Sequence, residues 1–324
     1  ERYATHHHEF ILSYSDLPTT IQKMVNHFGE PYADSSALPL YLLSKITRPY
    51  VTVALNGDGG DDIFAGYMRY WLDPWANAYL HLPGLLTRRI LPSIIDLLHD
   101  RADKPVGASL VNGLKRLDQL TRIDSRASVL RWGSYFSPDQ RRCLWRREFW
   151  QETGAHNAEE WLITRYDELP DNAGRLDRTL NCDVNTYLLG DLLVKADRMS
   201  MAASLETRSP FLDYQLVEWA ARLPENLKMH GRQGKHLLKR AFSGYLPAEV
   251  LHHRKQGFGI PLGAWFRGPL ADWTTQTLLG GNNPLAIWFN TGQIETMLDE
   301  HNSGHLDHGK RIWALVMLSL WLEG

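Results

Sequence analysis

Apolar residues in the first 56 positions form two short continuous runs and two longer segments with helical spacing. The runs HEFIL (8–12) and YVTVALN (50–56) are rich in β-branched and apolar side chains, as buried strands are. Between them, PTTIQKMVNHF (18–28) and ALPLYLLSKIT (37–47) repeat apolar residues at helical spacing, which predicts two helices. Strands that are joined through helices pair in parallel, so the pattern predicts an α/β fold.

The chain beyond residue 67 shows no further strand pattern and alternates helical spacing with proline and glycine breaks. We therefore expect the rest of the chain to be largely helical. The final segment RIWALVMLSLWLEG (311–324) is apolar on nearly every face, so it should form a buried helix. Two strands alone leave edges and faces uncovered, which points to further sequence upstream of Glu1.

Charge and composition exclude several classes of protein. The 35 basic residues balance 37 acidic ones, for a net charge of -2, so there is no one-sign field to favour nucleic acid. The apolar run 312–322 is about half of the ~20 residues of a membrane helix, and the N-terminus lacks the pattern of a secretion signal. Cys143 and Cys182 are too few for a disulfide framework. We expect a cytoplasmic protein with no nucleic-acid or membrane partner.

The segment VTVALNGDGGDDIFAGYMRYW (51–71) is the most informative for chemistry, because it predicts a strand, a glycine-rich turn and a helix. Ligands of open parallel sheets bind at such corners. The helix beginning near Asp61 would direct free amides to this corner. The turn glycines allow positive φ and a close approach of the backbone to a ligand, and they are Gly57, Gly59 and Gly60.

Three carboxylates in the same turn change the kind of ligand that we expect. Asp58, Asp61 and Asp62 would repel a bare phosphate, so a bound polyphosphate requires a bridging cation. Mg²⁺ fits, since it takes one or two carboxylates and keeps phosphate oxygens as further ligands. The alternative is structural: Asp61 or Asp62 caps the helix and the glycines form a tight turn.

Histidines form two groups that resemble metal sites at first sight. His6, His7 and His8 would alternate between the two faces of a strand, so they cannot converge on one ion. His301, His305 and His308 have helical ligand spacing, but Asn302, Ser303 and Gly304 argue against a continuous helix. We expect no zinc site in either group.

Four segments in a fixed order carry a family resemblance. They are NGDGGDDIFAGY (56–67), EPYADSSALPLYLLSK (30–45), DLLVKADRMSMAASLETRSPFLD (191–213) and GKHLLKRAFSGYLPAEVLHHRKQGFGIPLGAWFRGPL (234–270). In that order, they resemble the SGDGGDELFGGY signature, the substrate loop and helix, the central helix with its ExRxPFLD turn, and the lysine-bearing loop of the glutamine-hydrolysing asparagine synthetases. The resemblance covers the chain except for a divergent middle.

The resemblance implies both a fold and a reaction. The fold is α/β: a partial parallel sheet of the ATP-pyrophosphatase (adenine nucleotide alpha hydrolase-like) type, followed by a largely helical C-terminal region. We expect a partial nucleotide-binding part at 1–72, a divergent helical region at 73–170 and a helical synthetase part at 171–324. The implied reaction is the amidation of aspartate through an aspartyl adenylate, with ATP and Mg²⁺ as cofactors and release of AMP and pyrophosphate.

Residues of the acidic turn and of the lysine-bearing loop acquire roles from the resemblance. Asp58 occupies the position of an acidic residue that supports formation and aminolysis of the adenylate. Lys255 matches the lysine that neutralises the phosphates. Asp61 and Asp62 would hold Mg²⁺ and pyrophosphate. The nucleotide-binding backbone would include Asn56, Gly57, Gly59 and Gly60.

Two further pairs are candidates for binding the substrate. Asp34 and Ser36 fall in the loop that meets the amino-acid substrate in the family, although the arginine that some asparagine synthetases have there is absent. Arg208 and Glu206 either clamp a carboxylate or form a structural ion pair. Three charged residues at neighbouring positions of one predicted helix should form a buried network beside the pocket, without a catalytic role: Lys195, Asp197 and Arg198.

Two parts of the family pattern have no counterpart in these 324 residues: the SGGxDSS pyrophosphate loop and the glutaminase domain. We expect both to lie upstream on the same polypeptide, so that the isolated segment is inactive and the complete protein is active. The substrate partner is aspartate or a related carboxylate, and a homodimer is left open. Two other functions also stay open: an amidotransferase on another carboxylate, and a degenerate non-catalytic binding subunit, against which the retained carboxylates argue.

Overall fold

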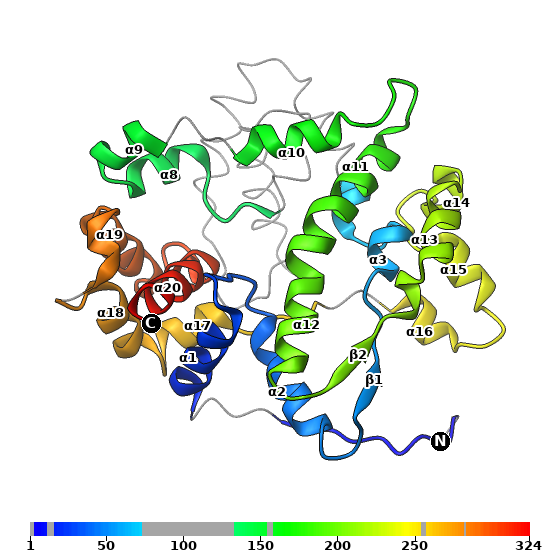
Figure 1. Cartoon of the computed structure of the whole chain (residues 1–324), viewed down its shortest axis with the longest axis horizontal. Helices are drawn as coiled ribbons and strands as arrows, with labels where there is room; N and C mark the ends of the chain where they lie inside the picture. Colours follow the sequence, from blue (N-terminus) through cyan, green and yellow to red (C-terminus); the bar gives the residue numbers. More distant parts are fainter. Residues whose placement is uncertain (1–2, 12–15, 73–132, 154–157, 254–256, 282) are drawn as a thin grey trace.

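Two short parallel strands lie beside a long helical rod in the computed structural model of this chain (Figure 1). Strand β1 (Val53–Leu55) pairs with strand β2 (Glu206–Arg208), with Ala54 opposite Thr207. The α/β class is therefore confirmed, with helices predominating. The described residues are 3–11, 16–72, 133–153, 158–253, 257–281 and 283–324.

The strands differ from the sequence-based expectation in three respects. β1 lies inside the predicted 50–56 run, but residues 8–11 form no strand, and Ile11 is 97% exposed. The partner of β1 is β2, so the expectation of no strand after residue 67 is wrong. A three-residue strand is too short to produce a visible alternation. The predicted burial of β1 is also wrong, because Val53 and Leu55 are exposed.

Helices α1 (Leu17–Phe28) and α2 (Ala37–Thr47) confirm the two predicted helices that precede β1. Helix α1 has a proline in its first turn and ends at Gly29, which has a φ of 68° and whose amide donates to the Val25 carbonyl. Proline at the start and a left-handed glycine at the end are common helix boundaries. These local features explain why the sequence located this helix within one residue.

Apart from β2, the regular elements in the rest of the described chain are helices, so the prediction of a largely helical region is confirmed. In chain order its elements are α3 (Gly60–Ile63), α8 (Pro138–Leu144), α9 (Arg147–Thr153), α10 (Ala158–Tyr166), α11 (Arg175–Asp183), the π-helix η3 (Val184–Leu192), α12 (Leu193–Met201), the 3₁₀-helix η4 (Pro210–Leu212), α13 (Tyr214–Ala221), α14 (Glu225–Lys228), α15 (His236–Ala241), α16 (Ala248–His252), α17 (Leu262–Arg267), α18 (Ala271–Leu279), the 3₁₀-helix η5 (Pro284–Ile287), α19 (Thr291–Asn302) and α20 (Gly309–Glu323). None of the described helices combines the length and apolar character that a bilayer span requires.

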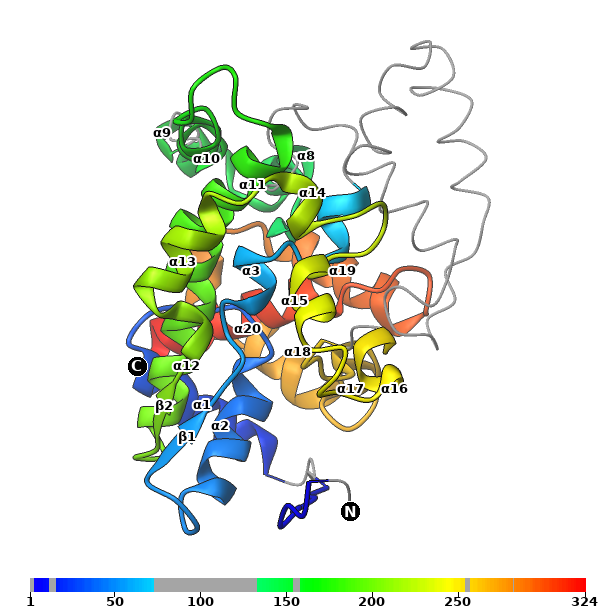
Figure 2. The same cartoon turned by 90° about the vertical axis from the view of Figure 1, so that its right-hand side faces the viewer.

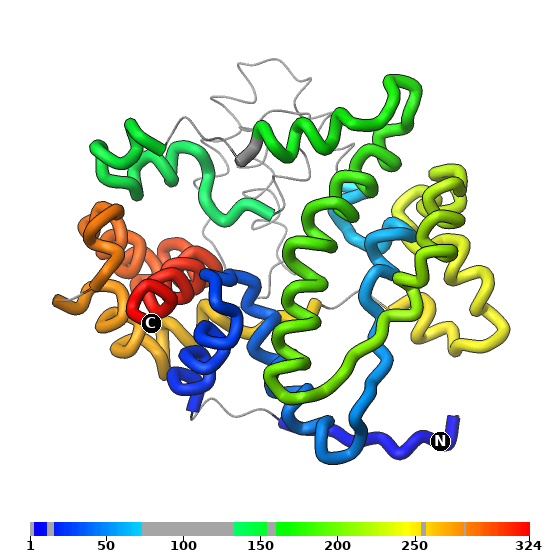
Figure 3. Tube along the Cα trace, in the orientation of Figure 1, coloured from blue at the N-terminus to red at the C-terminus, as the bar shows by residue number. Residues whose placement is uncertain are grey.

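The main core surrounds α20, which confirms the prediction of a buried C-terminal helix. Helix α20 contacts α1, α17 and α18, so the last element of the chain packs against the first (Figure 3). Ile312 and Val316 are fully buried in α20, and Trp313 is nearly so. Burial of large apolar side chains here contributes most of the driving force that holds this group of helices together.

Helices α11, η3 and α12 follow one another without a break and form the rod that carries the site. Helix α12 packs against α2 and β2, while α11 and η3 contact α3 (Figure 1). The turned view shows α3 close to α13 and α15 (Figure 2). π-helical segments are rare and often mark functional positions, so η3 at this junction is notable.

Ile312→Ala should lower the free energy of unfolding by about 2–5 kcal/mol, because it leaves a cavity in the main core. Ile287→Ala is the matched control, since Ile287 is 54% exposed and should lose less than about 1 kcal/mol. Denaturant unfolding of both variants measures the difference. Equal losses would contradict the assignment of α20 to the core.

Candidate active site

The acidic turn, residues 56–62, begins where β1 ends. Asn56 organises the first residues of this turn. The Asn56 amide continues the strand pairing by donating to the Arg208 carbonyl at 2.9 Å. The Asn56 side chain donates to Asp58 Oδ2 at 2.8 Å, and its Oδ1 accepts from Ser209 Oγ. Asn56 therefore links the turn to the chain that follows β2 and orients the Asp58 carboxylate.

The glycines of the turn serve close packing within the protein. Gly59 has a φ of 85°, and a Cβ there would lie 2.2 Å from Leu212 Cδ2. A Cβ on Gly60 would lie 3.2 Å from Phe211. No atom of the described residues would lie within 4 Å of a Cβ at Gly57. Of the predicted nucleotide-binding glycines, Gly57 thus has room for a ligand, whereas Gly59 and Gly60 approach the ETRSPFLD segment.

The helix after the turn, α3, is only four residues long and begins at Gly60, next to the predicted start near Asp61. Its N-cap position is Gly59, and no side chain makes a capping hydrogen bond to it. The capping alternative for Asp61 or Asp62 is therefore not what the geometry shows. The three carboxylates take different environments instead.

Asp58 and Asp61 lie close enough to influence each other's charge. Burial raises the pKa of Asp58, the positive charge of Lys195 opposes this rise, and the negative charge of Asp61 adds to it. Asp61 Oδ1 lies 3.0 Å from Lys235 Nζ. Gly66 makes room for this ion pair, because a Cβ on Gly66 would lie 1.9 Å from Asp61 Oδ1. Lys235 was not singled out from the sequence, although it stands in the GKHLLKR segment.

Asp62 is buried, and only 1% of it is exposed. The Tyr67 hydroxyl donates to its Oδ2 at 3.3 Å, and its Oδ1 is buried without a hydrogen-bond partner in the described part of the chain. Burial, followed by the nearby Asp183, raises the pKa of Asp62 to about 6. The buried position argues against direct contact between Asp62 and a metal ion at the corner.

A buried cluster near Asp62 was not singled out from the sequence. Arg69 Nη2 donates to Asp183 Oδ2 at 2.6 Å, and the Tyr70 hydroxyl donates to the same oxygen at 2.6 Å. The Arg69 guanidinium stacks on the rings of Tyr67 and Tyr187, at 4.4 and 4.6 Å from their centroids. The GYMRY sequence after the acidic turn was the available indication, since its Arg lies among aromatic residues.

The predicted substrate residues Asp34 and Ser36 meet on Lys195. Lys195 Nζ donates to Asp34 Oδ2 at 2.6 Å and to Ser36 Oγ at 2.7 Å. Burial alone would raise the pKa of Asp34, but the Lys195 ammonium and hydrogen bonds from Lys195 and Ser36 lower it overall. Because Asp197 and Arg198 are exposed, the expected buried network is wrong for these two residues and holds for Lys195.

Arg208 and Glu206 form an ion pair on β2, with Arg208 Nε 2.7 Å from Glu206 Oε1. Their side chains are 66% and 52% exposed, so solvent screens the pair. Of the two alternatives for this pair, the geometry matches the structural ion pair. Lys255 lies outside the described residues, between the end of α16 and the start of α17.

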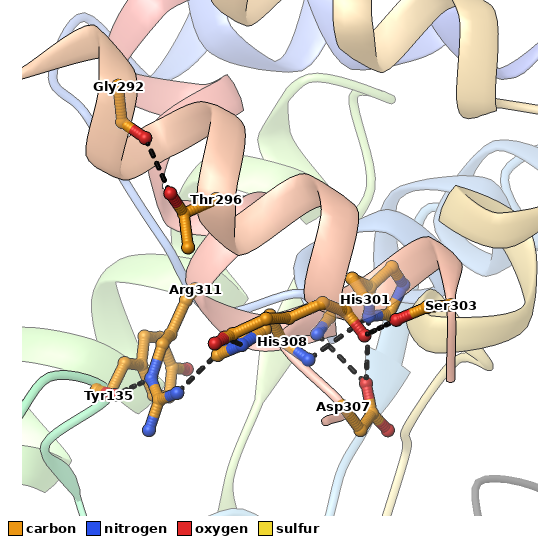
Figure 4. A network of polar contacts seen from close by, with 10 residues as sticks. Tyr135, Gly292, Thr296, His301, Ser303, Asp307, His308 and Arg311 are labelled. Carbon is orange, nitrogen blue, oxygen red and sulfur yellow. Dashed lines mark hydrogen bonds and ion pairs between the residues drawn. The ribbon is translucent and has the colours of Figure 1, made fainter. Parts of the chain in front are cut away.

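His301 and His308 use both ring nitrogens within the protein (Figure 4). His301 Nε2 donates to the Gly263 carbonyl, and its Nδ1 accepts from the His308 amide, each at 3.1 Å. His308 Nε2 donates to Glu300 at 2.7 Å, while Arg311 Nη1 donates to His308 Nδ1 at 2.8 Å. Burial lowers the pKa of both histidines. Neither ring keeps a lone pair for a zinc ion.

The described residues contain no group of three or more His, Cys, Asp or Glu side chains that could hold a metal ion by themselves. This does not conflict with a nucleotide-borne Mg²⁺, which needs only one or two protein carboxylates. Asp61 fits that requirement, because it is a partly exposed oxygen donor at the end of β1. A cavity of about 750 Å³ lies elsewhere, lined by residues such as Arg142, Trp145 and Asn290 and by no predicted site residue.

Taken together, the fold and site define an α/β protein with a glycine-rich acidic corner at the end of a parallel strand. A family model described as Asparagine synthase matches residues 1–323. The chain therefore belongs to the asparagine synthase family.

Curated relatives agree with this membership. Asparagine synthetase [glutamine-hydrolyzing] 1 of Bacillus subtilis is 27% identical over 312 residues, which cover 96% of this chain and 46% of the relative. A putative asparagine synthetase [glutamine-hydrolyzing] of Mycobacterium bovis is 30% identical, over 96% of this chain and 45% of its own length. Amidase chry2 of Gibberella zeae is 32% identical over 71% of this chain and 35% of its own length. The chain spans less than half the length of these relatives.

Asp62→Asn should stabilise the protein more at neutral pH than at acid pH. A carboxyl whose folded pKa is raised to about 6 favours the folded state fully below its ordinary pKa, and this contribution is lost as the pH rises towards 6 and above. The stability gain of the variant should therefore grow by on the order of 1–3 kcal/mol between pH 4 and pH 7.5.

Denaturant unfolding at several pH values measures this difference. Asp299→Asn is the control, because the Asp299 side chain is exposed on α19 and stays in water in both states. A gain for Asp62→Asn that does not change with pH would contradict the raised pKa of this buried carboxyl.

Proposed function

We propose that this chain forms the ATP-dependent part of an enzyme that amidates aspartate through an aspartyl adenylate. The observation that carries the proposal is the corner at the end of β1, where the charges of Asp61 and Lys195 both influence the pKa of Asp58, together with the hydrogen bond from the Lys195 ammonium to Asp34 of the predicted substrate loop. Membership of the asparagine synthase family supports the reaction class. The ATP-pyrophosphatase type of fold belongs to the same proposal, supported by the parallel sheet.

The proposed reaction has two steps. In the first, a carboxylate oxygen of aspartate attacks the α-phosphorus of ATP, an O–P bond forms, and pyrophosphate leaves with the electrons of the broken P–O bond. In the second, ammonia forms a C–N bond at the activated carbonyl, and AMP leaves. The ammonium-like adduct must lose protons, so an acceptor near the attacking amine is required.

The proposed roles of the corner residues follow from their environments. Asp58 accepts a proton in the second step, a role that suits a carboxylate whose pKa is raised by burial. Asp61 holds Mg²⁺, which when bound neutralises phosphate charge. The Asn56 and Gly57 backbone contacts the nucleotide. Lys255, which lies outside the described residues, neutralises charge on the phosphates.

The source of ammonia and the cellular setting are part of the proposal. The names of the Bacillus subtilis and Mycobacterium bovis relatives state that they hydrolyse glutamine. We therefore take glutamine as the amido donor, handled by a further domain of the full-length protein, and the cytoplasm as its location. A homodimer remains an open part of this proposal.

A second candidate is an amidotransferase that acts on a different carboxylate. The 30–36 loop offers Asp34 and Ser36 to Lys195 and contains no arginine for a second substrate carboxylate. Similarity to amidase chry2 also shows that sequences of this kind occur under other names. This candidate keeps the same adenylate chemistry and changes only the carboxylate.

ATP–pyrophosphate exchange by the full-length gene product tests the proposed function. Exchange should depend on a carboxylate substrate, and aspartate should give the highest kcat/KM in a panel that includes glutamate, asparagine and larger carboxylic acids. Preference for another acid would favour the second candidate. A folded protein that shows no exchange with any carboxylate would contradict both.

Asp61→Asn should raise the Mg²⁺ concentration needed for half-maximal exchange by about tenfold or more, because a neutral amide is a weaker ligand than a carboxylate. Asp62→Asn is the matched control, since Asp62 is buried and its substitution should leave the Mg²⁺ requirement nearly unchanged. A larger effect in the control than in Asp61→Asn would reverse the assignment of the metal ligand.

A further inference from the structure

Lys195 joins the predicted substrate loop to the helical rod of the site. Its side chain is 12% exposed, and its ammonium donates to Asp34 and Ser36. Tyr32 attaches the same loop at a second point, because its hydroxyl donates to the Asp191 carbonyl oxygen at 2.8 Å and to the Asp191 carboxylate. Asp191 and Lys195 are four residues apart on η3 and α12, so the loop runs along one face of the rod.

The single positive charge of Lys195 acts on more than one carboxyl group. Its ammonium acts to lower the pKa of three carboxyls, which are Asp34 on the substrate loop, Asp58 on the acidic turn and Asp191 on the rod. Burial acts in the opposite direction on all three carboxyls. The pKa is lowered overall only for Asp34, and it stays raised for Asp58 and Asp191. One cation therefore offsets part of the cost of burying three carboxyl groups that come from three different segments. Asp61 and Asp183 have cations of their own, Lys235 and Arg69.

Loss of the ammonium would affect the loop first. Asp34 organises the loop through its side chain, since Asp34 Oδ1 accepts from the Ser36 amide at 2.9 Å and Asp34 Oδ2 from the Ser36 hydroxyl at 2.8 Å. Without Lys195, this carboxylate would keep its burial and lose its counter-charge, which is a strongly unfavourable state. Movement of the loop that exposes the Asp34 carboxylate to water would then become favourable.

We propose that Lys195 is a positioning residue for substrate binding: its ammonium holds the 30–36 loop against the rod, so that the loop meets the amino-acid substrate in a fixed position. This inference rests on the proposed function for its substrate. Lys195 acts through the loop and need not touch the reacting atoms. It should therefore affect the carboxylate substrate more than ATP.

Steady-state kinetics of the full-length protein separate this role from general stability. Lys195→Met should raise the KM for the carboxylate substrate by about tenfold or more, as expected for loss of a charge-assisted contact, with less than about a threefold change in the KM for ATP. Lys195→Arg keeps the charge and should recover at least part of the defect.

Lys228→Met is the matched structural control. Lys228 also forms an ion pair from a buried side chain, with Nζ 2.8 Å from Asp177 Oδ1, but it lies on α14, outside the predicted site. It should lower Tm and leave both KM values unchanged. Equal increases in the two KM values for Lys195→Met, or identical defects in the Met and Arg variants, would overturn the inference.

Hydrogen exchange gives a readout that does not depend on activity. In Lys195→Met, amide exchange should become faster in residues 30–36, whereas in Lys228→Met it should not change there. A folded Lys195→Met protein with unchanged hydrogen exchange in this loop would overturn the inference even if activity falls.

If Lys195→Met does not fold, Ser36→Ala provides the second variant. It removes one partner of the ammonium, so it should produce the same selective change at a smaller size. A wild-type protein without ATP–pyrophosphate exchange activity would instead refute the proposed function. The hydrogen-exchange measurement on residues 30–36 would still decide the role of Lys195.

Discussion

This site depends on one constraint: carboxylates that are removed from water are paired with cations from distant segments. An ionised carboxylate that leaves water costs several kcal/mol unless a counter-charge and hydrogen bonds compensate for it. Asp34, Asp61 and Asp183 each meet such a cation, Lys195, Lys235 and Arg69 respectively. These contacts connect the substrate loop, the acidic turn and the rod formed by α11, η3 and α12.

Close backbone packing complements the ion pairs. Gly59 brings the acidic turn against Leu212, and Gly66 leaves space for the Asp61–Lys235 pair. Side chains at these positions would push the turn away from its partners, so the glycines and the charges support one arrangement. The helical core around α20 is built mainly from apolar side chains, with a network of polar contacts around His308 and Arg311 at the start of the helix. The site is thus held mainly by directed interactions and the C-terminal helices mainly by hydrophobic burial.

The division among the three turn carboxylates has a functional consequence. Asp58 and Asp61 remain partly accessible at the end of β1, where a nucleotide and its cation are proposed to bind. Asp62 is buried and accepts a hydrogen bond from Tyr67, and burial and the negative charge of Asp183 raise its pKa. A cluster that looks uniform in sequence therefore contains groups with different exposure and different partners. Only the outer two have the access that ligand binding requires.

The sequence by itself determined the two helices before β1, the buried C-terminal helix, the glycine-rich acidic turn and the family resemblance. Each of these depends on a pattern within a short stretch of chain, such as helical spacing at 18–28 or the residues NGDGGDD. The sequence also singled out Asp34 and Ser36, although it did not show that Lys195 holds them.

Only the tertiary structure decided which segments meet. The partner of β1 proved to be residues 206–208 instead of 8–12, and Lys195 reaches Asp34 across 161 positions of the chain. A local pattern contains no information about such distant pairing, because the energy of an ion pair or a strand ladder depends on separation in space. The distance in space between two residues does not follow from their positions along the chain. It is set only when the helices pack together.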